Sequence, residues 1–281
     1  MSNTFDPRVT PVRPDLAAAS LRDRIDAPRY AEGRRFRVVE ASAPLRRGPQ
    51  PDAPLETEAL LGEAVTVYEE GEGWGWAQLE QDGYVGYLPL VALGAPGPAP
   101  THRVATLRTH AYPGPGIKLP PAAAPAFGAL VTIVREQDDF AVAADGLFYW
   151  ARHLRPVESR EADFVAVAEA FLGAPYLWGG RTSDGIDCSG LVQTGLRAAG
   201  IASPRDSDMI EAAIGAPIAA DGPLRRGDLV FWKGHIGVMR DAETLLHASG
   251  WHMQVVSEKL AAACDRIAAT GGGTVTSKKR L

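Results

Sequence analysis

A short β-branched sequence occurs twice in the first 160 residues, and this repeat constrains the fold more than any other feature. The first copy, LGEAVTV (61–67), is followed by an Asp82-Gly83 turn, and the second, FGALVTI (127–133), by an Asp145-Gly146 turn. Each copy belongs to a stretch of about 60 residues in which short strand-like runs alternate with Gly, Asp and Pro turns. The repeat therefore predicts two small β-barrels of five or six strands each.

The stretch GAPGPAP (94–100) marks the boundary between the two copies. Such a dense run of Gly and Pro supports neither a helix nor a paired strand. We interpret the two copies as SH3-like domains over residues 31–96 and 97–157, preceded by an N-terminal extension of residues 1–30.

The sequence pattern changes after residue 157. Residues 161–172 carry apolar side chains at the spacing of an amphipathic helix, and a second helix is predicted over 189–199, ending at Gly200. Three strand-like runs follow, at 228–232, 235–239 and 244–248. We predict an α+β domain over residues 158–270. The tail, 271–281, has few side chains that could pack, and we expect it to fray.

The composition excludes several classes of partner. The chain has 29 Lys and Arg residues against 34 Asp and Glu, a net charge of −5, so we expect no nucleic acid partner. No apolar run reaches the roughly 18 residues that a membrane span needs, and we expect no membrane association. The N-terminus lacks the basic start and apolar stretch of a secretory signal, which predicts a cytoplasmic protein with reduced thiols.

One of the two cysteines has the surroundings of a reactive thiol. Cys188 follows Asp187 and directly precedes the predicted helix at 189–199. The start of a helix favours an anion and lowers the pKa of a thiol. The alternative is a buried core cysteine, the commonest state of a free cysteine. Cys264, in the Ala-rich run LAAACDRIAA, has no polar surroundings, and we assign it no chemical role.

Two histidines could supply the base that a nucleophilic thiol needs. His235 and His247 lie on consecutive predicted strands, and a hairpin folded about Asp241 would place them directly opposite each other on one face. The alternatives are two core histidines, or a zinc site shared with Cys188. The usual CxxC and HxxxH clustering is absent, so we predict no metal and no cofactor. The remaining histidines are expected at the surface: His102, His110, His153 and His252.

Several of these segments together resemble a known family. The segments are GAPYLWGGRTSDGIDCSGLVQ (173–193), RRGDLVFW (225–232), GHIGV (234–238) and LLHAS (245–249). They resemble the NlpC-type papain-like cysteine peptidases that act on bacterial cell-wall peptides. With two SH3-like domains ahead, the chain is similar to γ-D-glutamyl-L-diamino acid endopeptidases of the dipeptidyl-peptidase VI type. The resemblance implies a papain-like α+β domain that cuts murein peptides with a free N-terminal L-Ala, in cell-wall peptide recycling.

The resemblance also implies roles for individual residues. It makes Cys188 the nucleophile, His235 the general base, and His247 the residue that orients His235. The positions that it assigns to substrate binding are Tyr176, Trp178, Asp187, Ser189, Ser207, Glu63 and Tyr84. The second SH3-like copy has Ala129 and Leu147 at the places of Glu63 and Tyr84. Because a carboxylate beside a thiol raises its pKa, Asp187 calls for a nearby cation, which we expect to be the ammonium of the substrate.

Two other functions remain open from the sequence. An amidase or acyltransferase on the same core would keep Cys188, His235 and His247 but would not need Asp187 or Glu63. A non-catalytic protein that binds the cell wall would use only the SH3-like domains.

Overall fold

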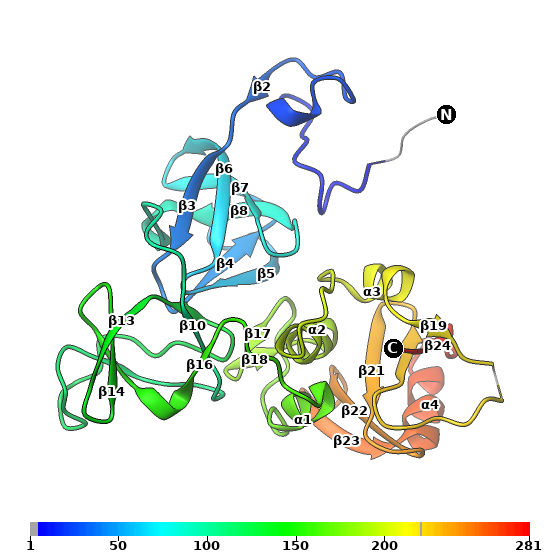
Figure 1. Ribbon diagram of the computed structural model, residues 1–281. Helices are drawn as coiled ribbons and strands as arrows, with labels where there is room; N and C mark the ends of the chain where they lie inside the picture. The colour runs from blue at the N-terminus through cyan, green and yellow to red at the C-terminus, as the bar shows by residue number, and fades with distance from the viewer. Residues whose placement is uncertain (1–4, 220) are drawn as a thin grey trace. The chain divides into compact units, whose positions relative to one another are not determined.

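The computed structural model describes residues 5–219 and 221–281, and the chain divides into two compact units (Figure 1). The first unit ends at Ser159 and the second begins at Arg160. This division falls two residues beyond the boundary that the sequence predicts between residues 157 and 158. Within the described ranges, no helix has both the length and the apolar character that crossing a membrane requires.

The N-terminal extension is part of the packing of the first unit. Its elements are β1 (Ala17–Ala18), η1 (Ala19–Leu21) and β2 (Tyr30–Ala31), with β1 and β2 paired in parallel. Leu16 and Leu21 are buried. The guanidinium of Arg13 lies 4.6 Å from the ring centroid of Trp76, a cation–π contact with the first SH3-like domain.

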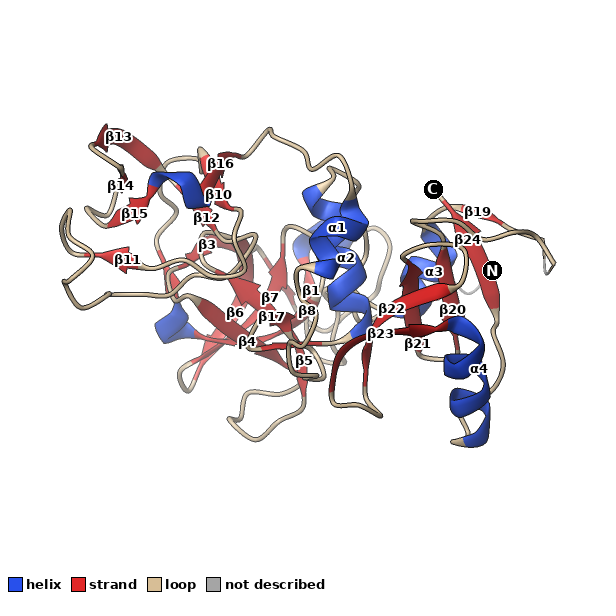
Figure 2. Ribbon diagram, turned by 90° about the horizontal axis from the view of Figure 1, so that it is seen from below, coloured by secondary structure: helices blue, strands red, loops and turns tan. Residues whose placement is uncertain are grey.

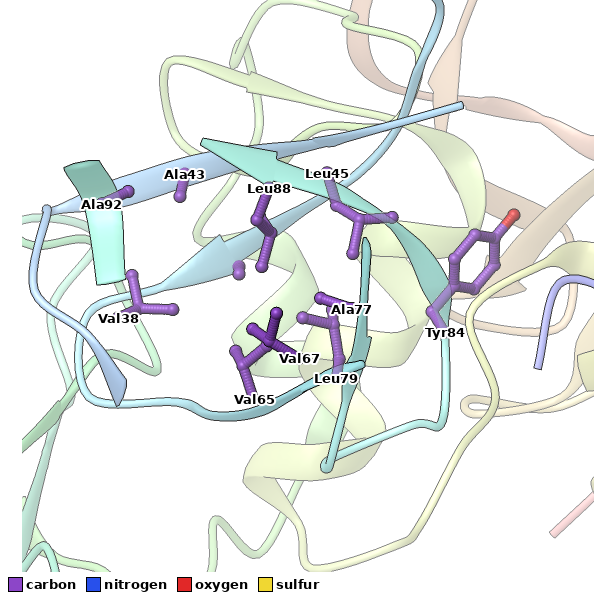
Figure 3. Packing of buried hydrophobic residues seen from close by; sticks show 11 residues of the cluster. Val38, Ala43, Leu45, Val65, Val67, Ala77, Leu79, Tyr84, Leu88 and Ala92 are labelled. Carbon is purple, nitrogen blue, oxygen red and sulfur yellow. The ribbon is translucent and has the colours of Figure 1, made fainter. Parts of the chain in front are cut away.

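The first SH3-like domain is one antiparallel sheet of seven strands. In chain order these are β3 (Arg34–Val38), β4 (Ser42–Arg46), β5 (Leu55–Leu60), β6 (Ala64–Gly71), β7 (Trp74–Leu79), β8 (Val85–Pro89) and β9 (Leu93–Gly94), with η2 (Leu90–Ala92) before β9. Burial alternates along β4 and β6, as expected for strands with one buried face. Figure 3 shows the resulting core, in which Leu45, Val65, Val67 and Leu79 pack together.

The second copy has two smaller sheets. One consists of β10 (His102–Val104), β12 (Leu130–Val131) and β16 (Leu154–Pro156), and the other of β11 (Ala111–Tyr112), β13 (Ile133–Gln137), β14 (Phe140–Ala143) and β15 (Phe148–Trp150), with η3 (Ala151–His153) between β15 and β16. The repeat is visible in the backbone, because Gly62 and Gly128, the second residues of the two copies, have φ of 81° and 85°. The pairings of the described residues form open series of strands, so the closed barrels remain a prediction.

The second unit is an α+β domain with four helices among the described residues. They are α1 (Phe164–Glu169), α2 (Cys188–Ala198), α3 (Ser207–Ala213) and α4 (Leu260–Ala269). α1 lies beside α2 (Figure 2). α1 is shorter than the predicted 161–172, because Asp163 caps its start and accepts from the backbone N–H of Val165 at 2.9 Å, and the chain turns after Glu169. α2 ends before Gly200, which has a φ of 80°, as predicted.

A six-stranded sheet forms the other half of this unit. Its order is β19 (Ala216–Pro217), β24 (Ser277–Arg280), β20 (Leu229–Trp232), β21 (His235–Met239), β22 (Thr244–Ser249) and β23 (Gln254–Lys259). A separate two-stranded ribbon, β17 (Arg181–Thr182) and β18 (Gly185–Ile186), precedes α2. α2 contacts β21 and β22, so the sheet and the start of α2 together position the candidate site.

The expectation that the C-terminal tail frays is wrong. β24 lies inside the sheet, between β19 and β20. It pairs with β20, where Leu229 lies opposite Lys279. Arg280 donates from Nη2 and Nε to the two carboxylate oxygens of Asp228, at 2.6 and 2.8 Å. Backbone pairing does not require apolar side chains, so a polar tail can complete a sheet. Apolar patterning therefore does not mark this strand in the sequence.

Candidate active site

Cys188 is the first residue of α2, so the helix begins one residue earlier than the predicted start at Ser189. Asp187 is the N-cap, and its Oδ1 accepts from the backbone N–H of Gly190 at 2.6 Å. The thiol is 6% exposed. Burial, together with the charge of Asp187, raises the pKa of Cys188 to about 12, although the backbone N–H groups of Ile236 and Ser189 act in the opposite direction. The helix start does lower the pKa of the thiol, as expected, but burial outweighs this influence, so the net change is upward and the resting thiol is protonated.

The two histidines meet across neighbouring strands. His235 Nε2 lies 2.7 Å from His247 Nδ1, and the ring centroids are 5.0 Å apart. His247 is 1% exposed, and His235 is half-buried. Burial, followed by the influence of His247, lowers the pKa of His235 to about 3. At neutral pH the raised pKa of the thiol and the lowered pKa of the imidazole both favour the neutral forms.

The register of this hairpin differs from the predicted one. Val238 pairs with Leu246 and Met239 with Leu245, so the turn is centred on Ala242 rather than on Asp241. His235 and His247 are therefore diagonal neighbours, not directly opposed. A shift of two residues keeps a side chain on the same face, which is why the rings still meet.

A glutamate that is not among the predicted site residues continues this pair. Glu258 Oε1 lies 2.8 Å from His247 Nε2. Arg266 of α4 donates to both carboxylate oxygens of Glu258, at 2.6 and 2.9 Å. The alternation of side chains along 254–259 could have indicated Glu258, but no sequence signal points to Arg266.

Asp187 has an internal cation. Arg205 donates from Nη1 to Oδ1 and from Nη2 to Oδ2, at 2.9 and 2.7 Å. The side chains of Arg205 and Asp187 are 1% and 9% exposed. Asp187 Oδ2 also accepts from the backbone N–H of Gly179 at 2.8 Å. Arg205, which is not among the predicted site residues, thus supplies the cation that the sequence led us to expect from the substrate.

Arg205→Met is expected to destabilise the second unit strongly. Removing one partner of a buried ion pair leaves an uncompensated charge, which costs about 3–5 kcal/mol in free energy of unfolding. Urea denaturation, with hydrogen exchange of α2 peptides to localise the effect, measures this loss. Asp187→Asn combined with Arg205→Met removes both charges and should be less destabilised. Lys259→Met, which breaks an exposed pair with Glu243, is the matched control. Equal stabilities of Arg205→Met and Lys259→Met would contradict the prediction.

The other predicted substrate residues of this unit lie at and around the start of α2. Ser189 is 6% exposed, and its hydroxyl accepts from Arg205 Nη1 at 2.8 Å and donates to Asp187 Oδ1 at 3.3 Å. Ser207 begins α3 and is 9% exposed. Tyr176 is half-buried, and burial followed by the influence of Cys188 raises its pKa, so the phenol stays protonated. Trp178 is 64% exposed.

Glu63 and Tyr84 belong to the first unit. Glu63 is 3% exposed, and its Oε2 accepts from the backbone N–H of Leu60 at 3.0 Å. Tyr84 is 2% exposed and joins the core of the first SH3-like domain, with its hydroxyl pointing away from the cluster (Figure 3). Their roles in substrate binding therefore stay predictions.

The remaining cysteine and histidines have other surroundings, and three of the histidines belong to the first unit. Cys264 is half-buried against a core cluster, and burial, followed by the charge of Asp265, raises its pKa. His110 and His252 are exposed, as predicted, whereas His102 and His153 are half-buried next to threonine hydroxyls. Within residues 5–219 and 221–281, no three His, Cys, Asp or Glu side chains form a group that could hold a metal ion.

Comparison with known proteins gives the relatives of both units. Residues 173–266 match the sequence model of the NlpC/P60 family, and residues 45–93 match that of the bacterial dipeptidyl-peptidase SH3 domain. A γ-D-glutamyl-L-lysine dipeptidyl-peptidase of Bacillus cereus is 28% identical over 206 residues, which are 63% of this chain and 60% of that protein. A probable endopeptidase of Mycobacterium bovis is 34% identical over 176 residues, which are 60% of this chain and 39% of that protein.

A solved structure shares the fold. The crystal structure of an NlpC/P60 family protein from Bacillus cereus superposes with a TM-score of 0.73 at 20% identity, covering 88% of this chain and 99% of that chain. The chain spans 60% of the length of its Bacillus cereus relative and 31% of that of a Bacillus subtilis γ-D-glutamyl-L-lysine dipeptidyl-peptidase. Residues 173–266 therefore resemble the NlpC/P60 family, and residues 45–93, ahead of them, resemble the bacterial dipeptidyl-peptidase SH3 domain.

Proposed function

We propose that this chain is a cysteine peptidase that hydrolyses the γ-D-glutamyl–diamino acid bond of murein peptides with a free N-terminal L-Ala. The observation that carries the proposal is the arrangement of Cys188, His235 and His247. The sulfur of Cys188 accepts from the backbone N–H of Ile236, the neighbour of His235, and His235 is in turn hydrogen-bonded to His247. A nucleophile, a base and a group that orients the base are what acyl transfer by a thiol requires.

The proposed reaction begins with transfer of a proton from the Cys188 thiol to His235. The thiolate attacks the γ-carbonyl of D-Glu, and the bond to the diamino acid breaks as His235 returns the proton to the leaving amine. Water, deprotonated by His235, then cleaves the thioester and restores the thiol. Tyr176 stays protonated because its pKa is raised, so its hydroxyl can donate to the oxyanion that forms in both steps.

The specificity in this proposal comes from the resemblance and from the names of the relatives. Two curated relatives are γ-D-glutamyl-L-lysine dipeptidyl-peptidases. We extend the proposal to a role in cell-wall peptide recycling in the cytoplasm. The two cysteines are free, which agrees with a reducing compartment. Fractionation of the producing cells tests this location.

Product analysis tests the proposed bond specificity. The full-length protein is incubated with L-Ala-γ-D-Glu-L-Lys, or with the peptide that has diaminopimelate in place of lysine, and the products are identified by mass spectrometry. The expected products are L-Ala-D-Glu and the free diamino acid. The isomer in which D-Glu is linked through its α-carboxyl is the matched control and should stay intact. Cleavage between L-Ala and D-Glu, or no cleavage of either peptide, would contradict the proposal.

One observation favours a second candidate, an amidase or acyltransferase on the same core. Asp187 is neutralised by Arg205, so its presence does not require a substrate ammonium. Such an enzyme would still form a thioester on Cys188. It would act on acyl substrates without a free amine, which the peptides above distinguish from the first candidate.

A further inference from the structure

Three polar side chains lie in a diagonal row across β21, β22 and β23. His247 pairs with Val256, two residues before Glu258, so Glu258 and His247 share one face of the sheet. The same two-residue diagonal relates His235 to His247. α4 packs against this face, where Ala263 joins the core cluster, and α4 also carries Arg266. The row from His235 to Glu258 thus ends on a helix that can hold it in place.

The contacts at the end of the row are specific. Oε1 of Glu258 accepts a hydrogen bond from His247 Nε2 and a second one from Arg266 Nη2. Oε2 of Glu258 accepts from Arg266 Nη1. Glu258 and Arg266 are 19% and 16% exposed, so solvent screens this pair only partly. A bidentate guanidinium orients a carboxylate more strictly than a single contact does.

These contacts determine which ring nitrogens carry protons. The hydrogen bonds that Glu258 accepts from His247 and from Arg266 lower its pKa. They outweigh burial, which acts in the opposite direction, and the pKa of Glu258 falls to about 2. An ionised carboxylate can only accept, so His247 donates from Nε2 and its Nδ1 carries a lone pair. That lone pair accepts the Nε2–H of His235, which leaves the lone pair of His235 on Nδ1. His235 is then in the base form that the proposed reaction needs.

We propose that Glu258, held by Arg266, is a positioning residue that acts through His247 to fix the tautomer of His235 and to stabilise the imidazolium formed when Cys188 loses its proton. This inference rests on the proposed function. It adds to Cys188, His235 and His247 a carboxylate and a guanidinium that do not touch the substrate.

The groups that influence His235 give the sign of each expected change. The charged or titratable groups that change the pKa of His235 are His247 on β22, Glu258 on β23 and Arg266 on α4. The thiol that His235 would deprotonate, that of Cys188, lies at the start of α2. Glu258 raises the pKa of His235, whereas Arg266 and His247 lower it. Glu258→Gln should therefore lower the pKa of His235, and Arg266→Gln should raise it. A merely structural role would reduce the amount of active protein without moving the pKa in opposite directions.

The first experiment needs no substrate. The rate of alkylation of Cys188 by iodoacetamide is measured against pH in the full-length protein by peptide mass spectrometry, with Cys264 as the internal reference. The acid limb of the Cys188 profile should move to lower pH in Glu258→Gln and to higher pH in Arg266→Gln, while Cys264 stays unchanged. On the peptide substrate, Glu258→Gln should lower kcat about 10- to 100-fold with little change in KM.

Glu169→Gln is the matched control. Glu169 lies in the same unit and is held by Arg226 and Arg240, and these contacts lower its pKa to about 2 as well. Loss of the Glu169 charge should not shift the pH profile of Cys188 alkylation. If Glu258→Gln behaves like Glu169→Gln in both kcat and profile, the proposal is overturned.

Nitrogen-15 NMR of the histidine rings tests the tautomer in the unaltered protein. His247 should be protonated at Nε2 and not at Nδ1, and a wild-type spectrum with the opposite tautomer overturns the proposal even where Glu258→Gln fails to fold. If no murein peptide is hydrolysed, the proposed function fails, whereas the alkylation profile and the spectrum still decide the role of Glu258.

Discussion

Cys188→Ala is expected to lower kcat for L-Ala-γ-D-Glu-L-Lys by a factor on the order of 10⁵ or more while leaving the fold intact. The substitution removes the nucleophile, and His235 alone could activate only water, which attacks an amide far more slowly than a thioester. The void left by one sulfur is small, and Asp187 still caps α2, so stability should change little. Single-turnover assays measure the loss, and circular dichroism checks the fold.

Cys264→Ala is the matched control for this experiment. It removes the other thiol of the second unit, which packs against a core cluster, and it should keep nearly full activity. Hydrolysis that survives Cys188→Ala but is lost in Cys264→Ala would show that we have assigned the nucleophile to the wrong cysteine.

Acetylation of the substrate amine is expected to have the second largest effect. N-acetyl-L-Ala-γ-D-Glu-L-Lys should be hydrolysed with a kcat/KM about 10⁴-fold below that of the free peptide. The acetyl group removes the ammonium charge and adds bulk, so acceptors built for that ammonium are left without it. Competition between the two peptides in one reaction, followed by mass spectrometry, gives the ratio directly. Equal rates would refute an amine-binding site even if Cys188 is the nucleophile.

Glu63→Gln tests the role that the resemblance assigns to Glu63 in binding the substrate amine. The amide oxygen of Gln can still accept from Leu60, which keeps the local fold. Glu63→Gln should reduce the difference in kcat/KM between the free and the acetylated peptide. Glu80→Gln, in the same domain and ion-paired with Arg35, should leave the difference unchanged.

Much of the candidate site was predictable because its parts obey local rules. The helical run that ends at Gly200 predicts α2 to within one residue at each end, and hence places Cys188 at the start of the helix. Because side chains alternate between the two faces of a sheet, His235 and His247 lie on one face for any register shift by an even number of residues. The predicted hairpin was wrong by two residues, and the hydrogen bond between the rings was nonetheless correct.

The charged partners were not predictable in this way. Arg205 lies 18 residues from Asp187 in the chain, and nothing in the run PRDSDM distinguishes an arginine that is buried against a carboxylate from one in solvent. The pKa of Cys188 depends on burial, which outweighs the favourable helix start. Pairing with β20, not apolar side chains, orders the C-terminal strand.

The sequence by itself determined that a helix starts next to Cys188, which strands carry His235 and His247, and that these two histidines share a face, because caps and side-chain periodicity act over only a few residues. The tertiary structure alone decided which cation neutralises Asp187, that Glu258 and Arg266 complete the row of polar groups, and that Cys188 is protonated at rest. These features depend on distances between segments far apart in the chain and on the exclusion of water, and neither quantity is encoded in a local pattern.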